Sequence, residues 1–330
     1  MLGQFTLTLL GADTSSAVAA IQLLEILYGV FEWFLEDAYG TRMNRLGEYL
    51  GVRMLGYPYM QRAYLAAVCI AVIGPLVGTF LVHREISLIG DTLAHTAFAG
   101  VAVGLFLNAT LSLSLSPLLT AFVTAVVTAL LVELLIEHGG AYSDTSLAIV
   151  LTGGFALGSV LITATDGGIA VGIDAYLFGS LATVSRADVG ILVAMSLFVG
   201  GLVTLAYRPL LYVTFDATGA RAARLNVRLY KRLMVVLTAL VVVSAMQIMG
   251  VILVAAMLVV PVATAALVAR SFKRSVLLAI LVAEFAAVAG VTVSYSYGIA
   301  AGGSIVLAAI AMYAAVLVGR SFPLERLRVQ

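Results

Sequence analysis

Asp91 and His95 lie four residues apart in an apolar stretch, ISLIGDTLAHTAFAGVAVGL at residues 86–105. In an α-helix this spacing places their side chains about 40° apart around the axis and about 6 Å apart along it. We expect the pair near the middle of a membrane span, where a carboxylate costs about 2.5–3.5 kcal/mol or more and must face protein or water. A carboxylate oxygen and an imidazole nitrogen on one face form half of a site for a divalent transition metal.

A purely structural interpretation of the same pair is an Asp–His hydrogen bond that fixes two helices against each other. The residues around the pair are small, and small residues let membrane helices approach closely: Ala94, Thr96, Ala97, Ala99 and Gly100. The pair is therefore expected at a helix interface or a lumen. Two such helices meeting across a two-fold axis would bring two aspartates and two histidines together.

Other polar residues carry weaker signals. Glu284 lies inside the apolar run 275–296, where it can line a cavity. Glu133 and His83 lie at the ends of spans, where ordinary solvation explains them. The sequence contains no GxxxxGK[ST] motif, so ATP hydrolysis, if it powers this protein, is expected in a separate chain.

The amino-acid composition indicates the class of fold that positions these residues. Of 330 residues 62% are hydrophobic and 11% are charged, against roughly 45–50% and roughly 25% in soluble domains. Such a chain cannot coat a water-facing surface, which excludes a soluble enzyme and a nucleic-acid-binding protein. The predicted fold is all-α, a polytopic membrane bundle of about eight to nine transmembrane helices of roughly 20 residues each.

The order of apolar runs and basic loops predicts the topology. The expected spans are 63–82, 86–107, 112–136, 145–165, 189–207, 233–249, 251–269, 275–296 and 304–319. The run 233–269 is too long for one span and is divided near Gln247 and Gly250. The basic segment 208–232 is placed in the cytoplasm, which puts the acidic loop 166–188 outside.

The ends of the chain are predicted to differ from this bundle. Residues 1–58 are expected to form an N-terminal extension, either amphipathic helices at the membrane surface or a marginal additional span. Residues 59–320 form the predicted transmembrane domain, and residues 321–330 a cytoplasmic tail.

Several ordered stretches resemble one known family. They are GPLVGTFLVHREISLIGDTLAHTAFAGVAVGL (74–105), DTSLAIVLTGGFALGSVLI (144–162), DAYLFGSLATVSRADV (174–189), FDATGARAARLNVRLYKRL (215–233), QIMGVILVAAMLVVPVATA (247–265) and VSYSYGIAAGGSIVL (293–307). Together they cover most of the chain from about Tyr59 to Arg320. The chain resembles the permease subunit of ATP-binding-cassette importers for zinc, manganese or iron, a family related in architecture to cobalamin and siderophore importer permeases.

The resemblance implies a set of partners. Such permeases work as homodimers in the cell membrane, with two cytoplasmic ATPase subunits and an extracytoplasmic metal-binding protein. The metal is transported rather than bound as a permanent cofactor, and its pathway uses the Asp and His of a DxxxH helix, here Asp91 and His95. No nucleic acid is implied.

The stretch 215–232 resembles the family's coupling helix, which docks on the ATPase. Its candidate coupling residues are Asp216, Arg221, Arg224, Asn226 and Arg228. Asn226 stands where the family has a glycine, and asparagine also tolerates a left-handed turn.

The leading functional hypothesis is the permease subunit of an ATP-driven zinc or manganese importer, with no enzymatic activity of its own. A permease for cobalamin or siderophore cargo is one alternative, although large organic cargo needs no histidine ligand. An ion-coupled secondary metal transporter, with Asp91 and Glu284 as its relay, is another.

Overall fold

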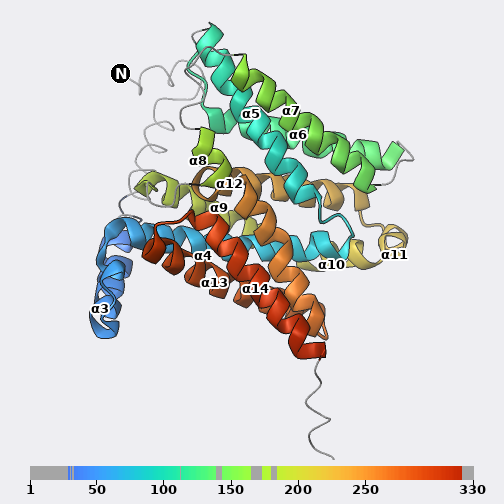
Figure 1. The fold of residues 1–330 in the computed structure, drawn as a ribbon. Helices are drawn as coiled ribbons and strands as arrows, with labels where there is room; N and C mark the ends of the chain where they lie inside the picture. The colour runs from blue at the N-terminus through green and yellow to red at the C-terminus, as the bar shows by residue number, and fades with distance from the viewer. Residues whose placement is uncertain are drawn as a thin grey trace, which may run out of the picture. The chain divides into compact units, whose positions relative to one another are not determined.

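The computed structural model describes residues 29, 31, 33–111, 113–138, 143–164, 173–179 and 184–321. Within these residues every regular element is a helix (Figure 1). For residues 136–138, 143 and 173–175 only the backbone is described. Much of the predicted outer loop 166–188 therefore lies outside the described residues.

Eight of the described helices are long and apolar enough to cross a membrane. They are α4 (Pro58–His83), α5 (Ile89–Leu111), α6 (Pro117–His138), α7 (Ser143–Thr163), α9 (Arg186–Leu205), α12 (Val227–Val268), α13 (Phe272–Tyr297) and α14 (Ala301–Ser321). Shorter helices lie between them: α8 (Ile173–Phe178), α10 (Tyr207–Phe215) and α11 (Ala217–Ala222). The predicted all-α, multi-pass membrane architecture is confirmed.

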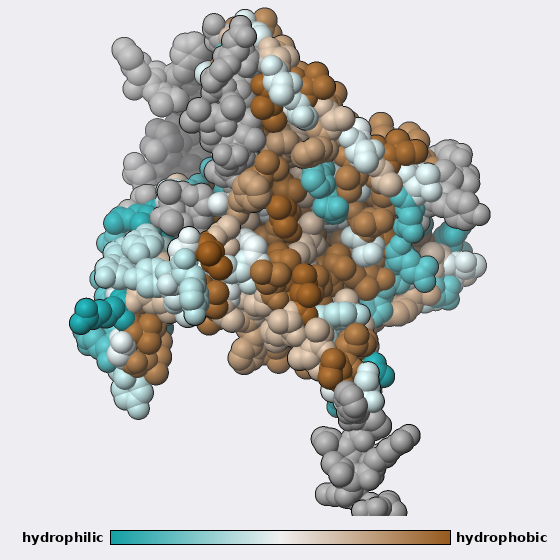
Figure 2. Space-filling view, viewed as in Figure 1, coloured by the Kyte–Doolittle hydropathy of each residue, from teal (hydrophilic) through white to brown (hydrophobic). Residues whose placement is uncertain are grey.

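The surface of the bundle has the character that lipid contact requires. Large apolar side chains are exposed on several helices, with Leu205 of α9 85% and Leu307 of α14 67% exposed. Figure 2 shows mainly hydrophobic residues over α13 and α14, and hydrophilic residues toward α10 and α11. Apolar side chains of this kind are unfavourable in contact with water and favourable in contact with the hydrocarbon core of a lipid bilayer.

Helix α12 contains the predicted division of the long apolar run. Its backbone is helical on both sides of Gly250, which itself has φ 80° and ψ 158°. This conformation is essentially restricted to glycine, and the ribbon changes direction between the two parts of α12 (Figure 1). A straight helix of 42 residues would be about 63 Å long, twice the hydrocarbon thickness. The break makes two lengths that each match one crossing.

Helix α5 packs against α6, α7 and α12, and α5, α6 and α7 run side by side in Figure 1. Its small residues permit this packing, since a Cβ added at Gly100 would lie 2.7 Å from the Cα of Ala121 on α6. Ala94, Thr96, Ala97, Ala99 and Gly100 are all buried, as expected of a helix interface. The predicted close packing around the Asp–His helix is confirmed.

Helix α4 approaches the second part of α12 equally closely. A Cβ at Gly78 would collide with the backbone carbonyl of Leu258, and one at Gly74 would contact Met257. Such backbone contact fixes the end of α4, and with it the turn that leads into α5.

The N-terminal region divides from the bundle between Gln61 and Arg62. Its described elements are the π-helix η1 (Phe34–Gly40), α3 (Thr41–Leu50) and the 3-10 helix η2 (Arg53–Gly56). Gln61 Nε2 donates to Asn44 Oδ1 and to the Leu55 carbonyl, each at 2.8 Å, which joins these elements. Helix α3 is amphipathic. Residues 1–28, 30 and 32 of the predicted extension, and residues 322–330 of the predicted tail, lie outside the described residues.

Candidate metal site and coupling surface

Asp91 lies in the first turn of α5. It is therefore close to a helix end rather than at mid-helix, where the sequence pattern had suggested it. The N-terminal end of a helix carries partial positive charge from its unpaired N–H groups, which stabilises a nearby carboxylate by about 0.3–1 kcal/mol.

His95 lies one turn further along the same face. Its Nε2 is 3.4 Å from Asp91 Oδ1, longer than a good N–H···O hydrogen bond. The Asp91 side chain is 40% exposed and the His95 side chain 23% exposed. The Nδ1 atom of His95 is buried and has no hydrogen-bond partner among the described residues. A buried ring nitrogen without a hydrogen-bond partner is uncommon in folded proteins, which sets His95 apart from an ordinary interior histidine.

Phe155 of α7 holds the His95 ring from the side. The two rings meet edge to face, with centroids 5.3 Å apart and planes at 90°, and Phe155 also stacks on Phe98. Gly154, beside Phe155, permits this approach, because a Cβ there would lie 2.6 Å from Thr96 Cγ2. The sequence carried no signal for Phe155, since nothing in its spacing links α7 to His95.

Asp91 and His95 supply two side-chain ligands and no more. The described residues contain no group of three or more His, Cys, Asp or Glu side chains placed to hold a metal ion. Divalent metals in proteins take four or more ligands. Among the described residues of one copy, no third side chain of these types joins the pair.

Glu284 belongs to a different part of the bundle. It lies half-buried on α13, which packs against α12 and α14, whereas α5 packs against α6, α7 and α12. The structure does not join Glu284 to Asp91 and His95 in one ligand group.

The predicted coupling segment 215–232 contains the last residue of α10, the short helix α11 and the start of α12. Asp216 caps α11, accepting a hydrogen bond from the Gly219 N–H at 2.7 Å. Asn226 caps α12, accepting from the Leu229 N–H at 3.1 Å. The left-handed residue of this segment is Arg224, at φ 61°. The interpretation of Asn226 as a left-handed turn is thus wrong, because its side chain is used as a helix cap.

The five candidate coupling residues, Asp216, Arg221, Arg224, Asn226 and Arg228, are all exposed. The segment is held beneath them by a small apolar cluster of Val213, Ala220 and Val227. A rigid surface with exposed guanidinium groups can dock on a complementary protein.

His83 and Glu133 are not simple solvated residues. The His83 ring packs against Phe215 and Phe272, and its Nδ1 lies 2.7 Å from the Thr79 carbonyl. Glu133 lines a cavity that also contains Arg84 and Lys231. These contacts join segments that are distant in the sequence, so no local sequence pattern predicts them.

The apolar helices and the polar pair on α5 define a multi-pass membrane transport protein. The chain belongs to the ABC 3 transport family, whose model matches residues 56–320. It is 35% identical over 264 residues to the manganese transport system membrane protein MntC of Halalkalibacterium halodurans, covering 79% of this chain and 87% of that protein.

Two further similarities support this family membership. The chain is 32% identical over 251 residues to the manganese import system permease protein ScaB of Streptococcus gordonii, covering 76% of this chain and 87% of that protein. The solved structure of PsaBC from Streptococcus pneumoniae in complex with Fab matches with a TM-score of 0.72 and 30% identity, covering 82% of this chain and 95% of that chain. The predicted membership among importer permeases of this class is confirmed.

Proposed function

We propose that this chain is the permease subunit of an ATP-driven importer of a divalent metal, manganese or zinc. The observation that carries the proposal is the Asp91–His95 pair on α5, in which His95 Nε2 lies 3.4 Å from an oxygen of the partly exposed Asp91 carboxylate. The similarity to manganese permeases supports metal as the cargo.

The two ligands favour transient binding. Carboxylate oxygen suits Mn²⁺, and imidazole suits several transition metals. Transport requires a site that holds the ion strongly enough to admit it and weakly enough to release it. A site with few protein ligands meets this requirement, because an ion that favours six ligands, such as Mn²⁺, then keeps part of its water shell.

We propose a homodimer as the working permease. A second copy would supply a second Asp–His pair, and two pairs give the four ligands that a divalent metal takes. An extracytoplasmic metal-binding protein would deliver the ion, and cytoplasmic ATPase subunits would dock on residues 215–232. The permease itself then hydrolyses no ATP.

The alternatives have less support. Cobalamin or siderophore cargo has no use for the Asp–His pair, and both curated relatives described above are named for manganese. A secondary transporter with Asp91 and Glu284 as its relay would need these residues to be linked, but they lie on different helix groups.

Manganese uptake by cells that lack their own importer tests the site. We expect Asp91→Asn and His95→Gln, each expressed with the ATPase and binding protein, to lower uptake by about tenfold or more, since each removes a metal ligand. Glu85→Gln is the matched control, because Glu85 is an exposed acid on the preceding turn. Wild-type uptake by both Asp91→Asn and His95→Gln, at equal membrane levels, would contradict the assignment.

A further inference from the structure

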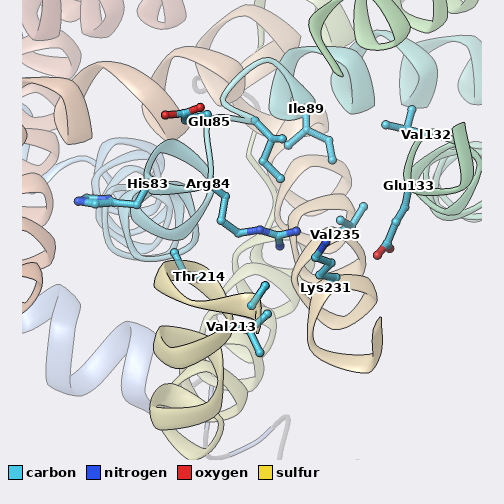
Figure 3. A pocket seen from close by; sticks show the side chains of 12 residues that line it. His83, Arg84, Glu85, Ile89, Val132, Glu133, Val213, Thr214, Lys231 and Val235 are labelled. Carbon is cyan, nitrogen blue, oxygen red and sulfur yellow. The ribbon is translucent and has the colours of Figure 1, made fainter. Parts of the chain in front are cut away.

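A cavity of about 440 Å³ lies where the α4–α5 turn meets α6, α10, α11 and α12. Two basic side chains line it, Arg84 from the turn and Lys231 from α12, together with the carboxylate of Glu133 from α6. Figure 3 shows the Arg84 guanidinium directed toward Lys231 and Val235, with Glu133 directed into the same space. The cavity is separate from the Asp–His pair, neither member of which lines it.

The charges facing the cavity do not balance. Glu85 and His83 also line it, but Figure 3 shows both side chains turned away from Arg84 and Lys231. Two cations therefore share the space with one carboxylate. Burial lowers the pKa of the Arg84 guanidinium from its ordinary value, and the negative charge of Glu133 acts in the opposite direction. The guanidinium is thus desolvated more than Glu133 compensates, and an added anion would restore the balance.

The remaining wall of the cavity is mainly apolar, formed by Ile86, Ile89, Val132, Val213, Ala217 and Val235. Thr214 also lines it, and its hydroxyl donates to the Leu210 carbonyl within α10. A site for a small free anion is usually polar on every side, whereas a phospholipid presents a phosphate next to glycerol and acyl carbons. Basic pockets between membrane helices at the cytoplasmic face hold lipid headgroups in this way. The basic segment 208–232, which contributes α10, α11 and Lys231, assigns the cavity to that face.

We propose that this cavity binds an anionic phosphodiester, with Arg84 and Lys231 as its ligands and the apolar wall against its carbon-bearing part. The guanidinium donates paired hydrogen bonds to phosphate oxygens, and the ammonium adds a point charge. The same two cations repel a divalent metal ion, so the cavity is not a second station for the cargo. Its occupant would bridge the turn before α5 to the segment that carries the coupling surface.

Native mass spectrometry of the purified full-length protein, loaded from phosphatidylglycerol or phosphatidylcholine vesicles, tests this site. We expect several-fold greater retention of phosphatidylglycerol. Lys231→Gln and Arg84→Gln should each lower that retention by about tenfold, the effect of losing one charge-assisted contact. Lys273→Gln is the matched control, because it removes one exposed positive charge from another basic loop.

A change of opposite sign separates binding from a structural role. Glu133→Gln removes the carboxylate that competes for Arg84 and should raise phosphatidylglycerol retention, which a loss of packing would not do. Arg84→Lys keeps the charge and should retain more lipid than Arg84→Gln. If Arg84→Gln fails to insert, Lys231→Gln and Glu133→Gln still carry the test.

Inorganic phosphate distinguishes the two sources of the anion. Phosphate that raises the thermal unfolding temperature of the wild type but not of Lys231→Gln, with no preference for phosphatidylglycerol, would make a free phosphate compound the occupant. Preference for phosphatidylglycerol that is lost in Lys231→Gln would make it a lipid. Equal retention of both lipids together with no response to phosphate would overturn the proposal, as would wild-type retention by both Arg84→Gln and Lys231→Gln.

Discussion

His95 is a partly buried imidazole that two neighbouring side chains contact, and its buried Nδ1 atom has no hydrogen-bond partner among the described residues. Asp91 lies near Nε2, and Phe155 covers the ring edge to face. An unpaired buried nitrogen costs free energy that a bound cation or water recovers. Fixing the ring in advance reduces the entropy lost when the ligand arrives. Phe155 is thus a positioning residue for the proposed metal site.

Phe155→Leu should weaken manganese binding and uptake by several-fold while leaving the fold intact. Leucine keeps an apolar side chain but loses the aromatic edge that orients His95, an interaction worth about 0.5–1.5 kcal/mol. Phe198→Leu on α9 is the matched control, since Phe198 is 53% exposed and Phe155 44%. Uptake titrated against metal concentration should show a raised half-saturation point for Phe155→Leu alone.

Gly250 decides the shape of α12. Besides its unusual φ and ψ, a Cβ there would lie 2.5 Å from the Gly179 nitrogen and 2.5 Å from the Leu177 carbonyl oxygen. The short helix α8 therefore packs directly against the break. Only a residue without a side chain satisfies both the backbone conformation and this approach.

Gly250→Ala should destabilise the protein strongly, by at least about 1–3 kcal/mol from backbone strain, with further loss from the collision with α8. Gly200→Ala is the control, because a Cβ at Gly200 meets nothing within 4 Å. The measurement is the melting temperature of each variant in detergent, with the remaining folded protein monitored by size-exclusion chromatography. Equal melting temperatures would mean that α12 does not break at Gly250.

The neighbouring glycines of α7 offer a second test of helix packing. A Cβ at Gly154 would lie 3.2 Å from Thr96 Cα and closer still to its methyl group, while one at Gly153 meets nothing within 4 Å. Gly154→Ala should cost about 1–3 kcal/mol by overpacking the α5–α7 interface. Gly153→Ala should be neutral or stabilising by about 0.5–1 kcal/mol. Similar melting temperatures for the two variants would contradict the interface.

At the scale of the whole molecule, α12 connects the two candidate sites. It begins at the exposed coupling segment, contacts α10 and α11, and packs along α5, which carries Asp91 and His95. A push on the coupling surface can therefore reach the metal helix through packed side chains and backbone. Movements of rigid helices of this kind are a common route from nucleotide binding to a change in access.

Reversing two charges on the coupling surface should release the ATPase. Arg221 and Arg224 are exposed and project from a segment whose core they do not join. The double variant Arg221→Glu, Arg224→Glu should lower co-purification of the ATPase subunits and abolish metal-dependent ATP hydrolysis, because it reverses two of the positive charges that the proposed docking surface presents. Arg320→Glu, at the exposed end of α14, is the control. Full co-purification by the double variant would place ATPase docking elsewhere.

Local sequence patterns predicted much of this architecture. Apolar runs of spanning length, the break near Gly250, the amphipathic character of residues 40–58 and the shared face of Asp91 and His95 all follow from period and composition. The position of Asp91 in the first turn of α5 did not, because the local pattern does not show where a helix ends within a longer apolar stretch.

The sequence by itself determined that this is a membrane protein, because a chain so rich in apolar residues is stable only in contact with lipid. It also determined that one helix carries a carboxylate and an imidazole four residues apart. Only the tertiary structure decided what surrounds them. Phe155 reaches His95 from another helix, and Arg84, Glu133 and Lys231 come from three separate segments to line one cavity. The physical reason is that such contacts depend on how closely two helix backbones pack. Small residues on both facing helices determine that distance together, so the sequence of one helix alone does not reveal it.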